Sequence, residues 1–202
     1  MVAVVLTGGA SRRMGEPKAW LPVGGRACLD RVAAACREAG ADVEFQGFLE
    51  GLGNRFPGTP AWPDPEPGSG PLAALAAALA RAPRDAVLLV AADMPFLRPA
   101  LLRAAAEAVA GGADWAVPEH GGRLHPLAAA YGPAVLPRAR ALLAAGRRDM
   151  HALLDEPALR GVRLSPQPAW GDPDRLLLNV NTPDDLALAR RLAEGDPPSA
   201  GG

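Results

Sequence analysis

The chain of 202 residues has few cysteines, a single lysine and no excess of positive charge. Its formal net charge of −1 leaves no basic field to hold a long nucleic acid, so we expect no nucleic-acid partner. No apolar run reaches the length of a membrane-spanning helix, so we expect no membrane association. The N-terminus leads directly into a hydrophobic strand, without the segments of a secretion signal, and we expect a cytoplasmic protein.

The two cysteines, Cys28 and Cys36, fall within one predicted helix. At about 1.5 Å of rise per residue they lie roughly 12 Å apart, whereas a disulfide needs Cα atoms within about 7 Å. Neither cysteine has the spacing to other side chains that a metal site needs. We therefore expect both to be reduced packing residues.

Short apolar runs alternate with segments of helical period along the chain, and 49% of the residues are hydrophobic. This alternation predicts an α/β fold with a mainly parallel central sheet. No internal repeat or long linker divides the chain. We expect one domain over residues 1–194, followed by a disordered tail over residues 195–202.

The individual elements follow from periodicity and from their start and stop signals. Glycine and proline predict a loop over residues 51–70. In such a fold, ligands bind at the carboxyl ends of the strands. Strands are predicted at 2–5, 43–46, 86–92, 115–117 and 127–131, with weaker ones at 162–164 and 175–178; helices are predicted at 26–39, 71–81, 99–110, 133–145, 149–154 (N-capped by Asp149) and from Thr182-Pro183 to 192.

A glycine-rich segment follows the first strand: Leu6-Thr7-Gly8-Gly9-Ala10-Ser11-Arg12-Arg13-Met14-Gly15-Glu16-Pro17-Lys18. Its glycine pair lets the backbone turn sharply and approach a ligand closely. The serine hydroxyl, the two guanidinium groups and the backbone N–H groups suit phosphate oxygens. The segment has neither the Gly-Lys-Ser/Thr of a Walker loop nor the Gly-x-Gly-x-x-Gly of a dinucleotide fingerprint.

Lys18 is the only lysine among 21 basic side chains. An ammonium is a compact point charge, whereas a guanidinium is a planar fork. We interpret this lysine as part of a site that needs one ammonium among several phosphates. Chance survival of a surface lysine is the alternative.

Asp93 opens the sequence Asp93-Met94-Pro95-Phe96, directly after the predicted central strand. It should therefore lie at the same edge of the sheet as the glycine-rich segment. Mg²⁺ usually takes one or two carboxylates together with substrate phosphates, so Asp93 is a candidate Mg²⁺ ligand. Its alternative role, capping the helix at 99–110, is weakened because that helix begins several residues later.

Asn179 and Asn181 are two of only three asparagines in the chain. Alternation along a strand end would place both side chains on one face. Amides both donate and accept hydrogen bonds, which is useful against a phosphate. An ordinary entry to the following helix is the alternative.

Taken in order, these motifs resemble the molybdenum cofactor guanylyltransferases, from Leu6 to Leu186. The likeness rests on Leu-x-Gly-Gly-x-Ser-x-Arg-Met-Gly-x-x-Lys, Asp-Met-Pro, His-Pro-Leu at His125 and Asn-x-Asn-Thr-Pro. It implies a Rossmann-like nucleotidyltransferase fold. It also implies Mg²⁺-dependent transfer of GMP from GTP to the terminal phosphate of molybdenum-bound molybdopterin, with release of pyrophosphate. Partner proteins would be a molybdoenzyme or a chaperone that receives the cofactor.

The resemblance also implies roles for individual residues. Lys18, with Arg12 or Arg13, would balance phosphate charge, and Asp93 would hold Mg²⁺. His125, Asn179 and Asn181 would lie on the side of the molybdopterin substrate. Nucleotide binding would involve Leu6, Thr7, Gly8, Gly9, Ser11, Lys18, Asp64 and Asp93.

Three alternatives stay open at this stage. A cytidylyltransferase acting on the same cofactor is disfavoured by Gly8-Gly9 and by Met94-Pro95 after the aspartate. A sugar-nucleotide pyrophosphorylase would have glycine in place of Ser11. A non-catalytic nucleotide-binding module is disfavoured by the intact Lys18 and Asp93. One departure from the family pattern is Pro17, which stands where an aspartate is common.

Overall fold

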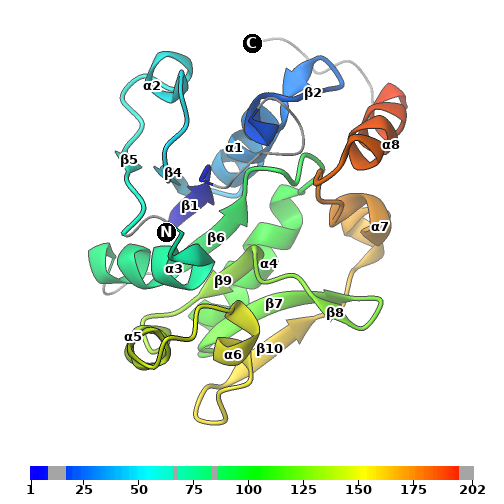
Figure 1. The fold of residues 1–202 in the computed structure, drawn as a ribbon. Helices are drawn as coiled ribbons and strands as arrows, with labels where there is room; N and C mark the ends of the chain where they lie inside the picture. The colour runs from blue at the N-terminus through cyan, green and yellow to red at the C-terminus, as the bar shows by residue number, and fades with distance from the viewer. Residues whose placement is uncertain (9–16, 66–67, 83–85, 196–202) are drawn as a thin grey trace.

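Figure 1 shows the computed structural model, which describes residues 1–8, 17–65, 68–82 and 86–195. The predicted tail lies outside these residues, apart from Gly195. An eight-stranded sheet forms the centre, in the order β10-β7-β9-β6-β1-β4-β5, with β8 paired to β7. Its strands are β1 (Val2–Leu6), β4 (Asp42–Gln46), β5 (Ala61–Trp62), β6 (Val87–Ala91), β7 (Trp115–His120), β8 (Arg123–Leu124), β9 (Ala128–Tyr131) and β10 (Gly161–Leu164).

The sheet is mainly parallel, as predicted. Strand β1 pairs in parallel with both β4 and β6, β4 pairs in parallel with β5, and β7 with β10. Strand β9 runs antiparallel to both β6 and β7. The carboxyl ends of β1, β4 and β6 therefore meet at one edge, which is where a ligand site is expected.

Helices cover both faces of the sheet (Figure 1). Along β6, Leu88 and Val90 pack on the side of α1 and α4, whereas Val87 and Leu89 pack on the side of α3, α5 and α6. All four side chains are fully buried, which explains the continuous apolar run in the sequence. The helices are α1 (Cys28–Glu38), α2 (Leu52–Arg55), α3 (Gly70–Arg81), α4 (Pro99–Ala110), α5 (Val135–Ala144), α6 (Met150–Leu154), α7 (Pro173–Leu176) and α8 (Pro183–Glu194).

Shorter elements complete the fold. They are the 3₁₀ turns η1 (Lys18–Trp20) and η2 (Pro168–Trp170) and the small hairpin of β2 (Pro22–Val23) with β3 (Arg26–Ala27). Helix α8 packs beside β2 in a separate apolar cluster that includes Val23, Val180 and Leu186. In the described part of the chain, no helix has both the length and the apolar character to cross a bilayer.

Several local predictions are confirmed. Cys28 and Cys36 are free and buried, and burial raises the pKa of each thiol to about 12. Asp149 caps α6 by accepting a hydrogen bond of 2.7 Å from the Ala152 N–H. Thr182 and Asp185 form a capping box at the start of α8, with proline in its first turn.

Two predictions of secondary structure are wrong. The weak strand at 175–178 is replaced by helix α7, because Asp172 caps a helical turn that begins with Pro173. The predicted loop over residues 51–70 contains helix α2 and the edge strand β5. Strand β5 has only two residues and exists through its pairing with β4, which local sequence does not encode.

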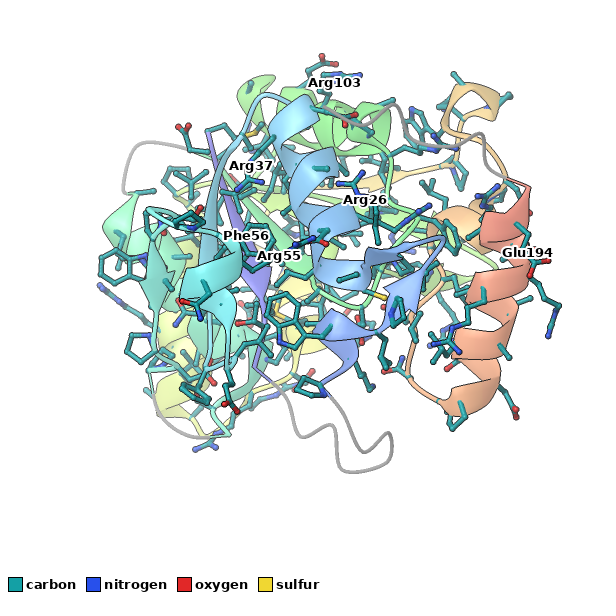
Figure 2. All side chains as sticks on the ribbon, turned by 90° about the horizontal axis from the view of Figure 1, so that it is seen from above. Arg26, Arg37, Arg55, Phe56, Arg103 and Glu194 are labelled. Atoms are coloured by element: carbon teal, nitrogen blue, oxygen red, sulfur yellow. The ribbon has the colours of Figure 1, made fainter. Side chains whose placement is uncertain are left out.

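A hollow of about 350 Å³ lies between α1 and α2, and its lining includes Arg26, Arg37, Arg55 and Phe56, which are labelled in Figure 2. The buried carboxylate of Asp30 accepts two hydrogen bonds from Arg55, at 3.0 Å and 2.6 Å. The Arg37 guanidinium lies 5.6 Å from the centre of the Phe56 ring. These contacts tie α2 to α1 and give Arg37 and Arg55 a structural role.

Candidate functional site

A larger cavity, of about 1100 Å³, opens at the carboxyl edge of the sheet. Its lining comes from the ends of β1, β4 and β6, from the start of α3 and from the connection between α7 and α8. The residues that line it include Leu6, Thr7, Gly8, Lys18, Gln46, Phe48, Asp64, Asp93, Asn179 and Asn181. Most of the site residues predicted from sequence therefore share one cavity.

Lys18 lies at the centre of the charged end of this cavity. Its Nζ donates a hydrogen bond of 2.6 Å to Asn181 Oδ1 and lies 3.9 Å from Asp93 Oδ2. The side chains of Lys18 and Asp93 are 23% and 21% exposed, so the ion pair is largely shielded from water. Three segments thus meet at one ammonium group: the start of a 3₁₀ turn, the end of a central strand and the entry to the last helix.

Asp93 is a carboxylate in an unfavourable electrostatic position. Burial raises its pKa, the positive charge of Lys18 opposes this rise, and the negative charge of Asp185 adds to it. A desolvated carboxylate of this kind gains energy from a cation that approaches it. A second cation beside Asp93, in addition to the Lys18 ammonium, would therefore stabilise its carboxylate.

Asn181 is held in place by the start of α8. Its backbone N–H donates to Asp185 Oδ2 at 2.9 Å, and the Thr182 N–H donates to the same oxygen at 2.8 Å. Burial opposes ionisation of Asp185, but hydrogen bonds from Thr182 and Asn181 prevail and lower its pKa. The capping box thus fixes the amide that faces Lys18, although Asn179 and Asn181 do not lie on a strand end as predicted.

Two glycines allow the chain segments after β1 and β4 to approach closely. A Cβ on Gly47 would lie 2.4 Å from the backbone N of Gly8, and Gly47 has a φ of +106° that side chains rarely adopt. A Cβ on Gly8 would lie 2.8 Å from Asp64 Oδ2. The Asp64 carboxylate therefore lies against Gly8, at the part of the cavity formed by β1, β4 and β5.

Sequence reasoning missed three residues of this region. Gly47, directly after β4, carries a usable signal, because a glycine at a strand end often marks a close approach of two backbones. Gln46 is 1% exposed, and nothing in the local sequence marks its amide as buried. Phe48 lines the cavity and is 86% exposed, so it forms part of its rim.

His125 does not line this cavity, although its neighbour Leu127 does. It lies between β8 and β9, where its backbone N–H donates to the Pro118 carbonyl at 2.9 Å. Burial, helped by the positive charge of Arg123, lowers the pKa of His125. The predicted site residues Gly9, Ser11, Arg12 and Arg13 lie outside the described residues.

Few side chains that could bind a metal lie near one another among the described residues. Within the ranges described, no three or more His, Cys, Asp or Glu side chains cluster closely enough to hold a metal ion. Among these residues, a cation at Asp93 would therefore find no more than one further ligand of these four types, and substrate phosphates or water could complete its coordination. This suits Mg²⁺, which is commonly bound by one or two carboxylates together with phosphate oxygens.

Comparison with known proteins gives concordant matches. A family model described as the MobA-like NTP transferase domain matches residues 3–161. The chain is 41% identical to a probable molybdenum cofactor guanylyltransferase of Pelotomaculum thermopropionicum, over 95% of this chain and 92% of that protein. It is 32% identical to a molybdenum cofactor guanylyltransferase of Rhizobium meliloti, over 93% and 89% of the two chains. The crystal structure of molybdopterin-guanine dinucleotide biosynthesis protein A from Archaeoglobus fulgidus superposes with a TM-score of 0.81, at 26% identity, over 97% of this chain and 100% of that one.

Proposed function

Since the chain belongs to the MobA-like NTP transferase family, we propose that it is a molybdenum cofactor guanylyltransferase. An oxygen of the terminal phosphate of molybdenum-bound molybdopterin attacks the α-phosphorus of GTP. A new P–O bond forms, the bond from the α-phosphorus to the bridging oxygen breaks, and pyrophosphate leaves with the electron pair. The observation that carries this proposal is the convergence of Lys18, Asp93 and Asn181 in one cavity at the carboxyl edge.

The attacking phosphate is already a nucleophile at neutral pH, so the site needs to position charges and has no need of a strong base. Lys18 supplies a positive charge that can follow the phosphates of GTP and of the departing pyrophosphate. Its present partner, Asn181, is a neutral amide that can release the ammonium and then hydrogen-bond to a phosphate oxygen itself. Arg12 and Arg13 are proposed to add positive charge from the preceding segment.

Asp93 is the residue that would hold the divalent cation, which we propose to be Mg²⁺. When bound, such a cation neutralises negative charge on the triphosphate. Asp93 supplies one desolvated carboxylate beside the phosphate-binding end of the cavity. The scarcity of other carboxylate ligands among the described residues is consistent with a metal that enters with the nucleotide.

The part of the cavity beside Gly8 and Asp64 is proposed to bind the guanosine. Gly8 lets the nucleotide approach the backbone after β1, and Asp64 presents a carboxylate there. A carboxylate accepts hydrogen bonds from two adjacent N–H donors, which guanine presents on one edge. Asn179, Asn181 and His125 are proposed to face the molybdopterin substrate, although His125 does not line the cavity. Because the product is a cofactor for other enzymes, a molybdoenzyme or a chaperone is the expected partner of this protein. We propose the cytoplasm as the location of the protein.

The proposal is tested by pyrophosphate release from GTP with molybdenum-bound molybdopterin and Mg²⁺, together with the mass of the dinucleotide product. GTP should be consumed only when the pterin is present, and CTP, ATP and UTP should react much more slowly. A faster reaction with CTP would identify a cytidylyltransferase instead. Absence of turnover with all four nucleotides would reject the transfer reaction.

A further inference from the structure

A polar network behind the cavity ties the edge strand β5 to β4 and to the end of α3. Arg81 donates through Nη2 to Gln46 Oε1 at 3.1 Å and to Glu44 Oε2 at 3.5 Å. The same carboxylate oxygen of Glu44 accepts a hydrogen bond of 2.8 Å from the Trp62 indole. The Arg81 guanidinium lies 4.7 Å from the centre of the Trp62 ring. One arginine thus contacts two residues of β4 and one of β5.

The network fixes the orientation of the Gln46 amide. A guanidinium can only donate hydrogen bonds, so the amide oxygen must face Arg81. The amide nitrogen then faces the opposite way, where it donates to the backbone carbonyl of Pro63 and lies 3.5 Å from that of Trp62. Because Gln46 is almost fully buried, this arrangement is shielded from competition by water.

The segment that Gln46 holds follows β5, the edge strand of the sheet. Strand β5 has two residues, and backbone hydrogen bonds at its flanks run from Phe45 N to Pro60 O and from Gly47 N to Trp62 O, both 2.9 Å. Pro63 has no N–H and cannot donate to the ladder. The Pro63 carbonyl instead accepts a hydrogen bond from the Gln46 amide. Asp64 follows immediately, with its carboxylate against Gly8.

We propose that Arg81 is a positioning residue for nucleotide binding, acting through Gln46 and the Pro63 carbonyl on the Asp64 carboxylate. Arg81 is not among the residues that line the cavity, so it acts without touching the nucleotide. Glu44 accepts a hydrogen bond from the same Nη2, and the Trp62 ring lies against the guanidinium, so both help to hold it in place. The inference rests on the proposed function in one respect, the contact of Asp64 with the bound nucleotide.

The test compares Arg81→Met, Arg81→Lys and a control, Arg103→Met. Arg103 lies on α4, does not line the cavity and donates an exposed hydrogen bond of 2.8 Å to the Glu38 carbonyl, so its replacement removes an arginine hydrogen bond outside the network. Loss of the hydrogen bonds from Arg81 should raise the dissociation constant and the KM for GTP about tenfold, with kcat changed less than about twofold. Arg81→Lys should restore part of the affinity, and Arg103→Met should bind like the wild type.

A double-mutant cycle separates positioning from general damage. Asp64→Ala alone should weaken GTP binding, and Arg81→Met added to Asp64→Ala should weaken it no further. Independent effects that simply add would overturn the proposal, as would wild-type affinity in a folded Arg81→Met protein. Should that variant fail to fold, Glu44→Gln replaces it in the same cycle, with a smaller expected loss of affinity.

Calorimetric titration of each nucleotide without pterin distinguishes this inference from the function itself. A wild type that prefers another nucleotide would reject guanylyl transfer. The positioning role of Arg81 would still predict weaker binding of that preferred nucleotide in Arg81→Met, and equal binding would reject it.

Discussion

The ammonium of Lys18 donates a 2.6 Å hydrogen bond to the Asn181 side chain across 163 positions of sequence. This bond joins two distant segments that line the cavity, because Lys18 follows the first strand whereas Asn181 precedes the last helix. The Asp93 carboxylate lies 3.9 Å from the same ammonium. Without a nucleotide, the lysine is therefore already held at the position where phosphate charge is expected.

Replacing Lys18 by arginine should cripple transfer while leaving the thermal midpoint of the nucleotide-free protein almost unchanged. A guanidinium is wider than an ammonium and cannot occupy the same point between Asp93 and Asn181. Displacement of a charge-stabilising group by about 1 Å can lower the rate on the order of a hundredfold. The measurement is pyrophosphate release beside thermal unfolding. Full activity would show that any positive charge suffices at this position.

Replacing Asp93 by asparagine should lower metal-dependent turnover by at least about a hundredfold, because the charge that holds the cation is lost. The nucleotide-free variant should be at least as stable as the wild type at neutral pH. Burial raises the pKa of Asp93 in the folded state, so the folded protein binds a proton at this carboxyl more tightly than the unfolded chain does. The contribution of Asp93 to stability is therefore present below its unfolded pKa and is lost as pH rises through its folded pKa. An uncharged asparagine does not undergo this loss.

The pH dependence of the thermal midpoint tests whether the ionised Asp93 side chain destabilises the nucleotide-free protein. The difference in thermal midpoint between Asp93→Asn and wild type should shrink as pH falls to about 4, where aspartate in the unfolded chain also becomes protonated. A variant that is markedly less stable at neutral pH would show that the Lys18 ion pair outweighs the cost of burial. Normal turnover in a folded variant would place the metal elsewhere.

Among nucleoside triphosphates, GTP with Mg²⁺ should raise the melting temperature most. A ligand that binds only the folded state stabilises it by mass action, so shifts at equal concentration rank the affinities. The expectation follows from family membership and from the Asp64 carboxylate against Gly8. Scanning fluorimetry with GTP, CTP, ATP and UTP is sufficient. A larger shift with CTP would favour cytidylyl transfer.

Gly47→Ala should destabilise the protein and weaken GTP binding about tenfold or more, since its Cβ would overlap the backbone of Gly8. Gly58→Ala is the matched control, because Gly58 also has a positive φ, of +74°, but open space around it. The control should lose only the backbone cost of about 1–2 kcal/mol and bind GTP normally. Chemical denaturation and calorimetry measure both effects. Equal behaviour of the two variants would contradict the close approach of Gly47 to Gly8.

Much of the fold could be predicted because its signals are local. Asp149 and Thr182 mark helix starts through their own capping bonds, and the buried run of β6 reflects its place between two helical layers. The gathering of Lys18 and Asp93 could also be predicted, because parallel strands end at the same edge. These features need no knowledge of which distant segments meet.

The unpredicted parts depend on tertiary partners. Strand β5 forms through its pairing with β4, and Gln46 owes its orientation to Arg81, 35 residues away. Helix α7 replaces a predicted strand because the cap at Asp172 outweighs a short apolar run. The meeting of Gly8 with Gly47 likewise requires the parallel pairing of β1 with β4.

The single lysine of this chain has a practical consequence for chemical labelling. Lys18 carries the only side-chain amine, and it lies in the cavity, so reagents selective for primary amines have two targets, Lys18 and the N-terminal amine. Intact-mass spectrometry would count these adducts directly. Protection by a bound nucleotide would then appear as the loss of one adduct per molecule, giving an occupancy assay for the site that needs neither turnover nor a labelled substrate.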